Sequence, residues 1–303
     1  MRQRTTGLAQ SVQLRLLRQA RTLGVDPNLV LTRYAVERFL YRLSRSPHAD
    51  RFVLKGAVLM IAWLGEMIRP TRDLDLLGYG EFSNDSVARL ISDVCRVEVQ
   101  PDGIIFEPAP IRIEEIRPAE GYGGRRATVV GFLGSARLTV QVDIAIGDAV
   151  TPDPEWLEYP SLLDLPRPKL RAYRTETAVA EKVHAMIALG PRNSRMRDFF
   201  DVSVLAQRRS FDGALLLLAL RNTFQRRGTV VLTGSPLALT PAFAEREEIR
   251  TQWAGFMNKT GLAAPADFAI VIASLAGFLT PVLDAAAHGR AFDLEWSPGG
   301  PWR

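Results

Sequence analysis

Cysteine, histidine and lysine are scarce in this sequence. The single cysteine, Cys95, excludes an intramolecular disulfide and is typical of a reducing compartment, so we expect a cytoplasmic protein. The three histidines stand far apart in the chain, and a structural zinc cluster is therefore not expected. Because the sequence contains only the lysines Lys55, Lys169, Lys182 and Lys259, nearly all its positive charge is arginine, a bias that a GC-rich coding sequence would also produce.

Long hydrophobic runs are also missing. No window approaches eighteen uninterrupted apolar residues, so the sequence predicts no transmembrane helix. The basic N-terminal stretch has no continuous apolar region, and a secretory signal is not expected. With 47% hydrophobic and 23% charged residues the composition is that of a globular protein, and the net charge of +5 favours an anionic partner, nucleic acid first.

Hydrophobic periodicity divides the chain into a mixed half and a helical half. The periodicity predicts helices over residues 8–23, 27–44, 56–65, 83–94, 176–189, 197–208, 212–225, 241–257 and 267–287. β-Branched segments predict strands over residues 52–54, 74–77, 104–106, 111–116, 127–133 and 136–146. The proline-rich stretch 151–168 is a candidate boundary. We therefore expect an α/β (α+β) domain with a mixed sheet over residues 1–165 and an all-helical domain over residues 166–303.

Two aspartates, Asp73 and Asp75, stand at the end of a hydrophobic segment. Because alternate residues of a strand point to the same face, their carboxylates should lie side by side while Leu74 and Leu76 face the core. Adjacent carboxylates repel each other unless a cation neutralises them, and oxygen ligands suit Mg²⁺ or Mn²⁺. A strand with charges on a solvent-exposed face gives the same pattern, so the pair alone leaves both interpretations open.

Asp143 supplies a third carboxylate in a later β-rich segment that could pair beside the first. Three carboxylates on adjacent strands can hold divalent cations for phosphoryl or nucleotidyl transfer. Lys55 adds positive charge, and Gly56 lets the backbone approach a phosphate closely before a helix begins. No GxxxxGK[ST] motif occurs, so a P-loop NTPase is not predicted.

Further motifs follow these residues in a fixed order. They are Lys55-Gly56, Arg69-Pro-Thr-Arg-Asp-Leu-Asp-Leu76, Tyr122-x-Gly-x-Arg126, Asp143, Gly147-Asp148, Glu176 to Lys182 and Arg197-Asp-Phe-Phe-Asp201. Together they resemble the DNA polymerase β-like nucleotidyltransferases, and more narrowly their AbiEii/AbiGii (MenT-like) toxin family. The resemblance covers residues 10–210, with one departure at Ala57, where a second Gly or Ser is usual.

The resemblance implies roles for the matched residues. Asp73, Asp75 and Asp143 would be the metal ligands, and Asp143 could also act as the base for an acceptor hydroxyl. Lys182 and Asp198, from the helical half, would complete the catalytic set. The residues expected to bind the nucleotide are Lys55, Gly56, Arg69, Arg72 and Asp201.

The resemblance also implies an activity. It predicts a bacterial toxin, monomeric and with a cognate antitoxin, that uses Mg²⁺ to transfer NMP from an NTP to RNA, with the tRNA 3′ end as the expected acceptor. Such a modification would block aminoacylation and translation. Two alternatives stay open: a protein or small-molecule hydroxyl as acceptor, and a catalytically inactive scaffold that binds nucleotide or RNA. Salt dependence of acceptor binding distinguishes the acceptors, and stabilisation by Mn²⁺ and NTP distinguishes the inactive scaffold.

Overall fold

The computed structural model describes residues 2–65, 71, 73–116, 123–260 and 267–303, with the side chains of residues 2–6 left out of the description. Its chain divides into two compact units. Unit 1 comprises residues 1–147 and 155–172, and unit 2 comprises residues 148–154 and 173–303. The chain therefore leaves unit 1, contributes a short segment to unit 2, and returns before it enters unit 2 for good.

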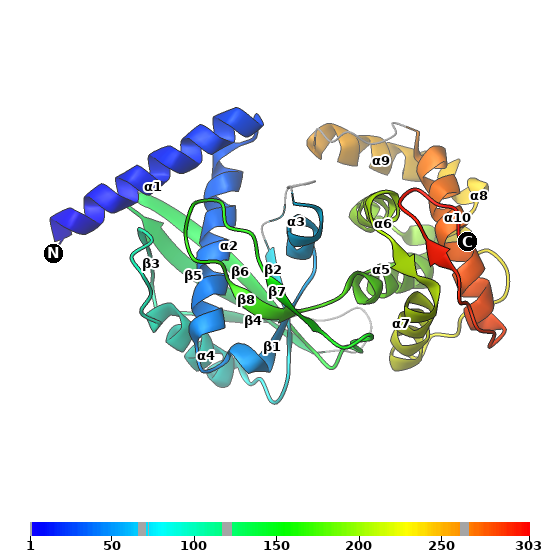
Figure 1. Ribbon diagram of the computed structural model, residues 1–303, viewed down its shortest axis with the longest axis horizontal. Coiled ribbons are helices and arrows are strands. Elements are labelled where there is room, and N and C mark those ends of the chain that lie inside the picture. Colours follow the sequence, from blue (N-terminus) through cyan, green and yellow to red (C-terminus); the bar gives the residue numbers. More distant parts are fainter. Residues whose placement is uncertain (1, 66–70, 72, 117–122, 261–266) are drawn as a thin grey trace. The chain divides into compact units, whose positions relative to one another are not determined.

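Unit 1 contains the mixed sheet that the sequence predicted (Figure 1). Its helices are α1 (Arg2–Leu23), α2 (Pro27–Arg45), α3 (Val58–Leu64) and α4 (Asn84–Arg96). Its strands are β1 (Phe52–Lys55), β2 (Asp73–Gly78), β3 (Ile104–Phe106), β4 (Arg112–Ile116), β5 (Gly124–Leu133), β6 (Ala136–Ile146), β7 (Glu155–Glu158) and β8 (Lys169–Ala172). The strand order is β3-β5-β6-β2-β1-β8-β7, and β4 also pairs with β5.

The central pairing of the sheet joins β2 to β6. The sequence indicated that these two strands could pair, and the structure shows that they run parallel. Leu74 and Leu76 of β2 and Val142 and Ile144 of β6 are almost fully buried, and they alternate with partly exposed polar residues. Helix α2 packs against β6, and α4 packs against β4 and β5. The sheet therefore has an apolar set of side chains in the core and a polar set at a partly exposed surface.

Side-chain caps define where two helices of unit 1, α2 and α4, begin. The Asp26 side chain accepts a hydrogen bond from Asn28 N, and Pro27 occupies the first turn of α2, so the helix begins where the sequence predicted. Ser83 caps α4 by accepting a hydrogen bond from Ser86 N. Both caps satisfy backbone N–H groups that a helix start leaves without partners.

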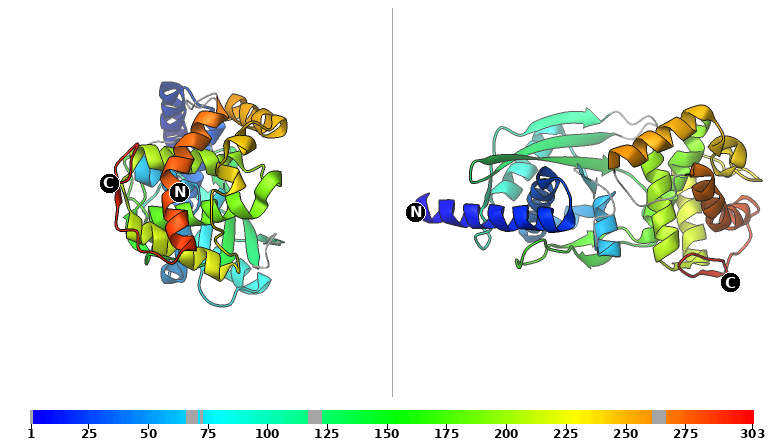
Figure 2. Two further views of the ribbon diagram at one scale, coloured as in Figure 1. Left: turned by 90° about the vertical axis from the view of Figure 1, so that its right-hand side faces the viewer. Right: turned by 90° about the horizontal axis from the view of Figure 1, so that it is seen from above.

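Unit 2 is built from helices with one short β-ladder. Its helices are α5 (Thr175–Leu189), α6 (Met196–Arg208), α7 (Gly213–Arg226), α8 (Pro241–Ala244), α9 (Glu247–Thr260) and α10 (Phe268–Ala287). The ladder pairs β9 (Phe211–Asp212) with β10 (Glu295–Trp296). The sequence predicted an all-helical domain here and did not predict this ladder. Helix α10 packs against α6 and α7 (Figure 2).

Within the described residues, α10 is the one helix whose length and apolar composition would allow it to cross a membrane. Half of that apolar stretch is buried inside the protein. Its Phe278 ring packs against Phe211, Trp296 and Trp302. These contacts are those of a core helix in a folded domain.

Four details differ from the sequence expectations. Strands β7 and β8 lie in or beside the stretch expected to be irregular, residues 151–168. The helix predicted over residues 241–257 is two helices, α8 and α9. Helix α3 begins at Val58 instead of Gly56, because Gly56 has a φ of 73°, outside the range of an α-helix. In the domain expected to be all-helical, the C-terminal segment forms β10 and buries Trp296.

Candidate active site

Cross-strand register brings four charged residues into one row across the sheet of unit 1. Lys55 of β1 lies opposite Asp75 of β2, Asp75 lies beside Asp143 of β6, and Asp143 lies opposite Arg126 of β5. Residues at the same level of neighbouring strands project to the same face of a sheet. Asp73, two residues before Asp75, projects to that face as well. The three aspartates predicted as a set therefore share one face of two adjacent strands.

The turn after β1 approaches the Asp75 carboxylate closely. A Cβ atom added to Gly56 would lie 2.1 Å from Asp75 Oδ2, and the φ of Gly56 is 73°. Both the space and the backbone conformation thus require glycine here. Gly56 lies before α3, which starts at Val58 and is 7 residues long. The nearest atoms to the Cβ position of Gly56 belong to the Asp75 side chain.

Arg126 binds the third carboxylate through two hydrogen bonds. Its Nε donates to Asp143 Oδ1 at 2.7 Å, and one terminal nitrogen donates to Oδ2 at 2.6 Å. Hydrogen bonding to Asp143 raises the pKa of Arg126 above its ordinary value; burial opposes the rise, and the charges of Asp143 and then Asp73 add to it. Asp73 therefore lies within electrostatic range of the Arg126–Asp143 pair.

Sequence reasoning placed Arg126 in a motif but missed its pairing with Asp143. The turn at Gly134 and Ser135 held the missing signal. Gly134 has a φ of 62°, as the first central residue of a two-residue hairpin turn of type II′ requires. Such a turn sets Leu133 opposite Ala136, and counting back in pairs from there places Arg126 opposite Asp143.

The three aspartates fit a hard divalent cation in their chemistry. They offer carboxylate oxygens on one face of neighbouring strands, the ligand type that Mg²⁺ and Mn²⁺ prefer. In the part of the chain that the structure describes, no three His, Cys, Asp or Glu side chains gather as a metal-binding group. All three aspartates are present, but the carboxylate of Asp143 forms an ion pair with Arg126.

The other predicted site residues divide between unit 2 and the undescribed segments. Arg69 and Arg72, predicted to bind nucleotide, lie outside the described residues, as does Tyr122. Lys182 of α5 lies within unit 2, where its Nζ is 2.8 Å from both Asp198 Oδ1 and Asp201 Oδ2 of α6.

The Lys182 cluster is almost closed to solvent. The side chains of Lys182, Asp198 and Asp201 are 15%, 5% and 0% exposed. Burial lowers the pKa of Lys182, but the charges of Asp201 and Asp198 outweigh that effect and raise the pKa above its ordinary value. Lys182 is therefore charged at neutral pH and neutralises two buried aspartates. Arg195, whose Nε lies 2.7 Å from Asp198 Oδ2, adds a second cation.

A second polar cluster in unit 2 determines the tautomer of the His184 ring. Arg227 lies 3.0 Å from His184 Nδ1, and the Thr229 hydroxyl lies 2.8 Å from Nε2. Because a guanidinium can only donate, Nδ1 must accept and the ring carries its proton on Nε2. Arg227 also lies 3.6 Å from Asp148, which helps to hold the segment 148–154 in unit 2.

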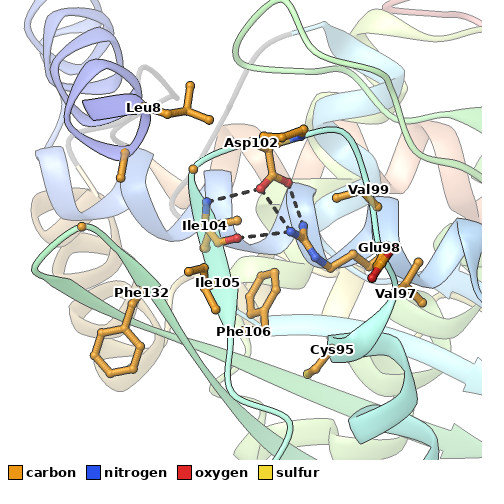
Figure 3. A pocket seen from close by; sticks show the side chains of 15 residues that line it. Leu8, Cys95, Val97, Glu98, Val99, Asp102, Ile104, Ile105, Phe106 and Phe132 are labelled. Carbon is orange, nitrogen blue, oxygen red and sulfur yellow. Dashed lines mark hydrogen bonds and ion pairs between the residues drawn. The ribbon is translucent and has the colours of Figure 1, made fainter. Parts of the chain in front are cut away.

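Unit 1 also has a cavity of about 480 Å³ that none of the residues in the charged row lines (Figure 3). Its walls are mainly apolar, and its most buried polar groups are Arg42 and Asp102, whose carboxylate accepts hydrogen bonds of 2.7 and 3.1 Å from Arg42. Arg42 also donates to the carbonyls of Arg38 and Ile104. Burial raises the pKa of Cys95, another lining residue, to about 12, so its thiol is protonated at neutral pH. With its ion pair satisfied internally, this cavity is a weaker candidate for catalysis than the charged row.

Asp73, Asp75 and Asp143 share one face of a mixed sheet beside the Lys55-Gly56 turn, the features on which a nucleotidyltransferase was predicted. The chain belongs to the AbiEii family of nucleotidyl transferase toxins of type IV toxin–antitoxin systems, whose family model matches residues 38–285. The family assigned from the sequence motifs is thereby confirmed.

The structure is similar to solved structures, and the first of them shares its fold. MenT4, a nucleotidyltransferase toxin from Mycobacterium tuberculosis H37Rv, is 20% identical, with a TM-score of 0.54 over 91% of this chain and 99% of that chain. JHP933 from Helicobacter pylori is 15% identical, with a TM-score of 0.46 over 83% of this chain and 91% of that chain. No curated protein matches the sequence.

Proposed function

We propose that this toxin transfers a nucleoside monophosphate from an NTP to an RNA hydroxyl, with the 3′ end of tRNA as the acceptor. The observation that carries the proposal is the row of Lys55, Asp75, Asp143 and Arg126 across four neighbouring strands, with Asp73 on the same face. In the reaction the acceptor oxygen bonds to the α-phosphorus, the bond from that phosphorus to the pyrophosphate oxygen breaks, and the hydroxyl gives up its proton.

Asp73, Asp75 and Asp143 are the residues that would hold Mg²⁺ or Mn²⁺. Bound there, a divalent cation supplies positive charge to the triphosphate and to the departing pyrophosphate. Asp143 is our candidate to accept the proton of the acceptor hydroxyl. Lys55, opposite Asp75 and largely buried, would add a fixed positive charge for the phosphates.

Basic residues support an RNA acceptor. The net charge of the chain is +5, and the side chains of Arg192, Arg208, Arg209 and Arg226 in unit 2 are exposed. Exposed arginines can contact RNA phosphates, and such contacts make binding weaken steeply with salt. A neutral small-molecule acceptor would lack that dependence. The family further implies a cognate antitoxin, and we place the protein in the cytoplasm, where NTPs and tRNA are found.

Incorporation of labelled nucleotide tests the proposal. The purified protein, Mg²⁺, α-labelled NTPs and total RNA should yield labelled RNA, and Asp75→Asn should lose at least about 100-fold in rate, a typical loss when a charge-stabilising group is removed. Asp85→Asn, which changes an exposed aspartate in the first turn of α4, is the matched control and should keep the wild-type rate.

The acceptor is identified in the same experiment. Label found in protein while RNA stays unlabelled would overturn the RNA part of the proposal. Sequencing of RNA 3′ ends after expression in a bacterial cell should show added nucleotides on tRNA. Lys182 and Asp198 stay predicted members of the catalytic set, and their variants belong in the same assay.

A further inference from the structure

We infer that Arg126 is a built-in counter-ion of the metal site: it holds Asp143 when no divalent cation is bound and moves to Glu114 when one binds. This inference rests on the proposed function, because Asp143 is the third carboxylate of that site. It gives Arg126 a positioning role: the residue acts through Asp143 instead of touching the substrate.

Arg126 occupies both oxygens of Asp143. The two hydrogen bonds of 2.7 and 2.6 Å form the forked geometry that is strongest between arginine and a carboxylate. Asp143 is 16% exposed, so little water competes for its oxygens. A divalent cation that approaches Asp143 meets a carboxylate already neutralised, and the guanidinium charge repels it.

A second partner for Arg126 stands on the opposite neighbouring strand. Arg126 of β5 lies between Asp143 of β6 and Glu114 of β4, each of them directly opposite it in register. The charge of Glu114 contributes to the raised pKa of Arg126, so Glu114 is already within electrostatic range. Glu114 is 44% exposed and is paired with Arg112, itself 77% exposed, so this surface pair can be rearranged easily.

These positions allow Arg126 to exchange carboxylates without a change in the backbone. The arginine side chain is 34% exposed and has rotatable bonds enough to move across one strand. When a cation takes Asp143, the guanidinium keeps a carboxylate partner at Glu114, so its charge is not left unpaired. Glu114 thereby lowers the free-energy cost of releasing Asp143, and metal binding becomes easier.

Metal affinity tests the exchange without any use of activity. Mn²⁺ binding to the full chain, followed by electron paramagnetic resonance, should tighten about tenfold in Arg126→Gln, which corresponds to the loss of one charge-assisted hydrogen-bonded competitor. Glu114→Gln should bind Mn²⁺ several-fold more weakly. Arg125→Gln is the matched control and should match the wild type, since Arg125 is next in sequence, faces the other side of β5 and pairs with Glu115.

Further variants separate the possible failures. The double variant Asp73→Asn/Asp75→Asn should abolish Mn²⁺ binding, which would assign the bound ion to this site. Arg126→Lys, which keeps the charge without the fork, should bind with intermediate affinity and serves if Arg126→Gln fails to fold. Wild-type Mn²⁺ binding with no gain in Arg126→Gln or Arg126→Lys would overturn this inference and leave the proposed function standing. A folded protein without any Mn²⁺ binding would overturn the inference together with the metal site on which the proposed function depends.

Discussion

At the scale of single residues, two of the predicted site residues, Gly56 and Lys182, lie in closely packed surroundings. The Asp75 carboxylate occupies the space that a side chain at residue 56 would need. Lys182 stands between two buried aspartates, and it and Arg195 offset their charges. Each of these arrangements makes a single substitution informative.

Gly56→Ala should destabilise the protein and lower its activity together. The positive φ costs about 1–3 kcal/mol for a residue with a Cβ atom, and the new methyl group would also displace the Asp75 carboxylate. Gly24→Ala is the matched control, because Gly24 has a φ of 65° with nothing within 4 Å of its Cβ position. Urea unfolding and nucleotide incorporation should show that only the variant at residue 56 loses more than the cost of the positive φ. Equal effects would contradict the close approach to Asp75.

Lys182→Met should cost about 3–5 kcal/mol of unfolding free energy at neutral pH, because it leaves two buried aspartates without their shared cation. The variant with Asp198→Asn and Asp201→Asn added should recover part of that loss. In the wild type, the raised pKa of Lys182 stabilises the fold in full below the ordinary lysine pKa of about 10.4, and this contribution declines as the pH rises above it. Urea unfolding from pH 7 to pH 11 would reveal the decline, and a wild-type minus Lys182→Met difference that stays constant over that range would contradict it.

At the scale of elements, a buried ion pair joins α2 to the loop before β3. Arg42 of α2 and Asp102 are 7% and 1% exposed, and the Tyr34 hydroxyl of α2 donates to the Asp102 carbonyl. These contacts fix the chain where it enters the sheet, beside the cavity of Figure 3.

Asp102→Ala should lower the unfolding free energy by about 3–5 kcal/mol, because the buried guanidinium of Arg42 would lose its carboxylate. Asp93→Ala is the control: Asp93 is 53% exposed and pairs with His48, so its loss should cost less than about 1 kcal/mol. Chemical denaturation of both variants decides the matter, and similar losses in the two would show that burial of the Arg42 pair is unimportant.

The sequence pattern predicted the long helices and strands well and missed several of the short strands. Long periodic segments such as α2, α4 and β6 were predicted almost to their ends, because hydrophobic period, caps and turn residues agree there. Strand β5 begins at Gly124, before the predicted start at residue 127. Strands β7 and β8 were missed because neither contains a β-branched residue and both lie in or beside a proline-rich stretch. They form because β8 pairs with both β7 and β1.

The candidate site was predictable in the same uneven way. The Asp-x-Asp spacing indicates one shared face, and Asp143 follows from its β-rich surroundings. The partner of Asp143 depends on strand register, a property of two segments that the composition of either one does not contain. The ion pairs of Lys182 depend on how α5 packs against α6, and only the resemblance to a family indicated that these residues matter.

At the scale of the whole molecule, the C-terminal tail covers part of the apolar core of unit 2. The Trp296 indole donates to the Ala206 carbonyl, and its ring packs 4.8 Å from Phe278 and 5.4 Å from Trp302. Without this cover, the apolar surface of α10 would face water.

Trp296→Ala should cost about 3–5 kcal/mol and increase binding of a dye that reports exposed apolar surface. Trp156→Ala, at a side chain that is 60% exposed on β7, should change stability by less than about 0.5 kcal/mol. Thermal melts and dye fluorescence of the two variants provide the comparison. A Trp296→Ala protein as stable as the wild type would mean that α10 is held by its other contacts alone.

The parallel pairing of β2 with β6 has a consequence for the cell that makes this toxin. Asp75 and Asp143 become neighbours only when two strands far apart in the sequence meet, and such non-local pairings form late in folding. A ribosome must therefore release residues up to the end of β6 before the carboxylates can assemble. Chains that end before β6 therefore lack the pairing that brings Asp75 beside Asp143.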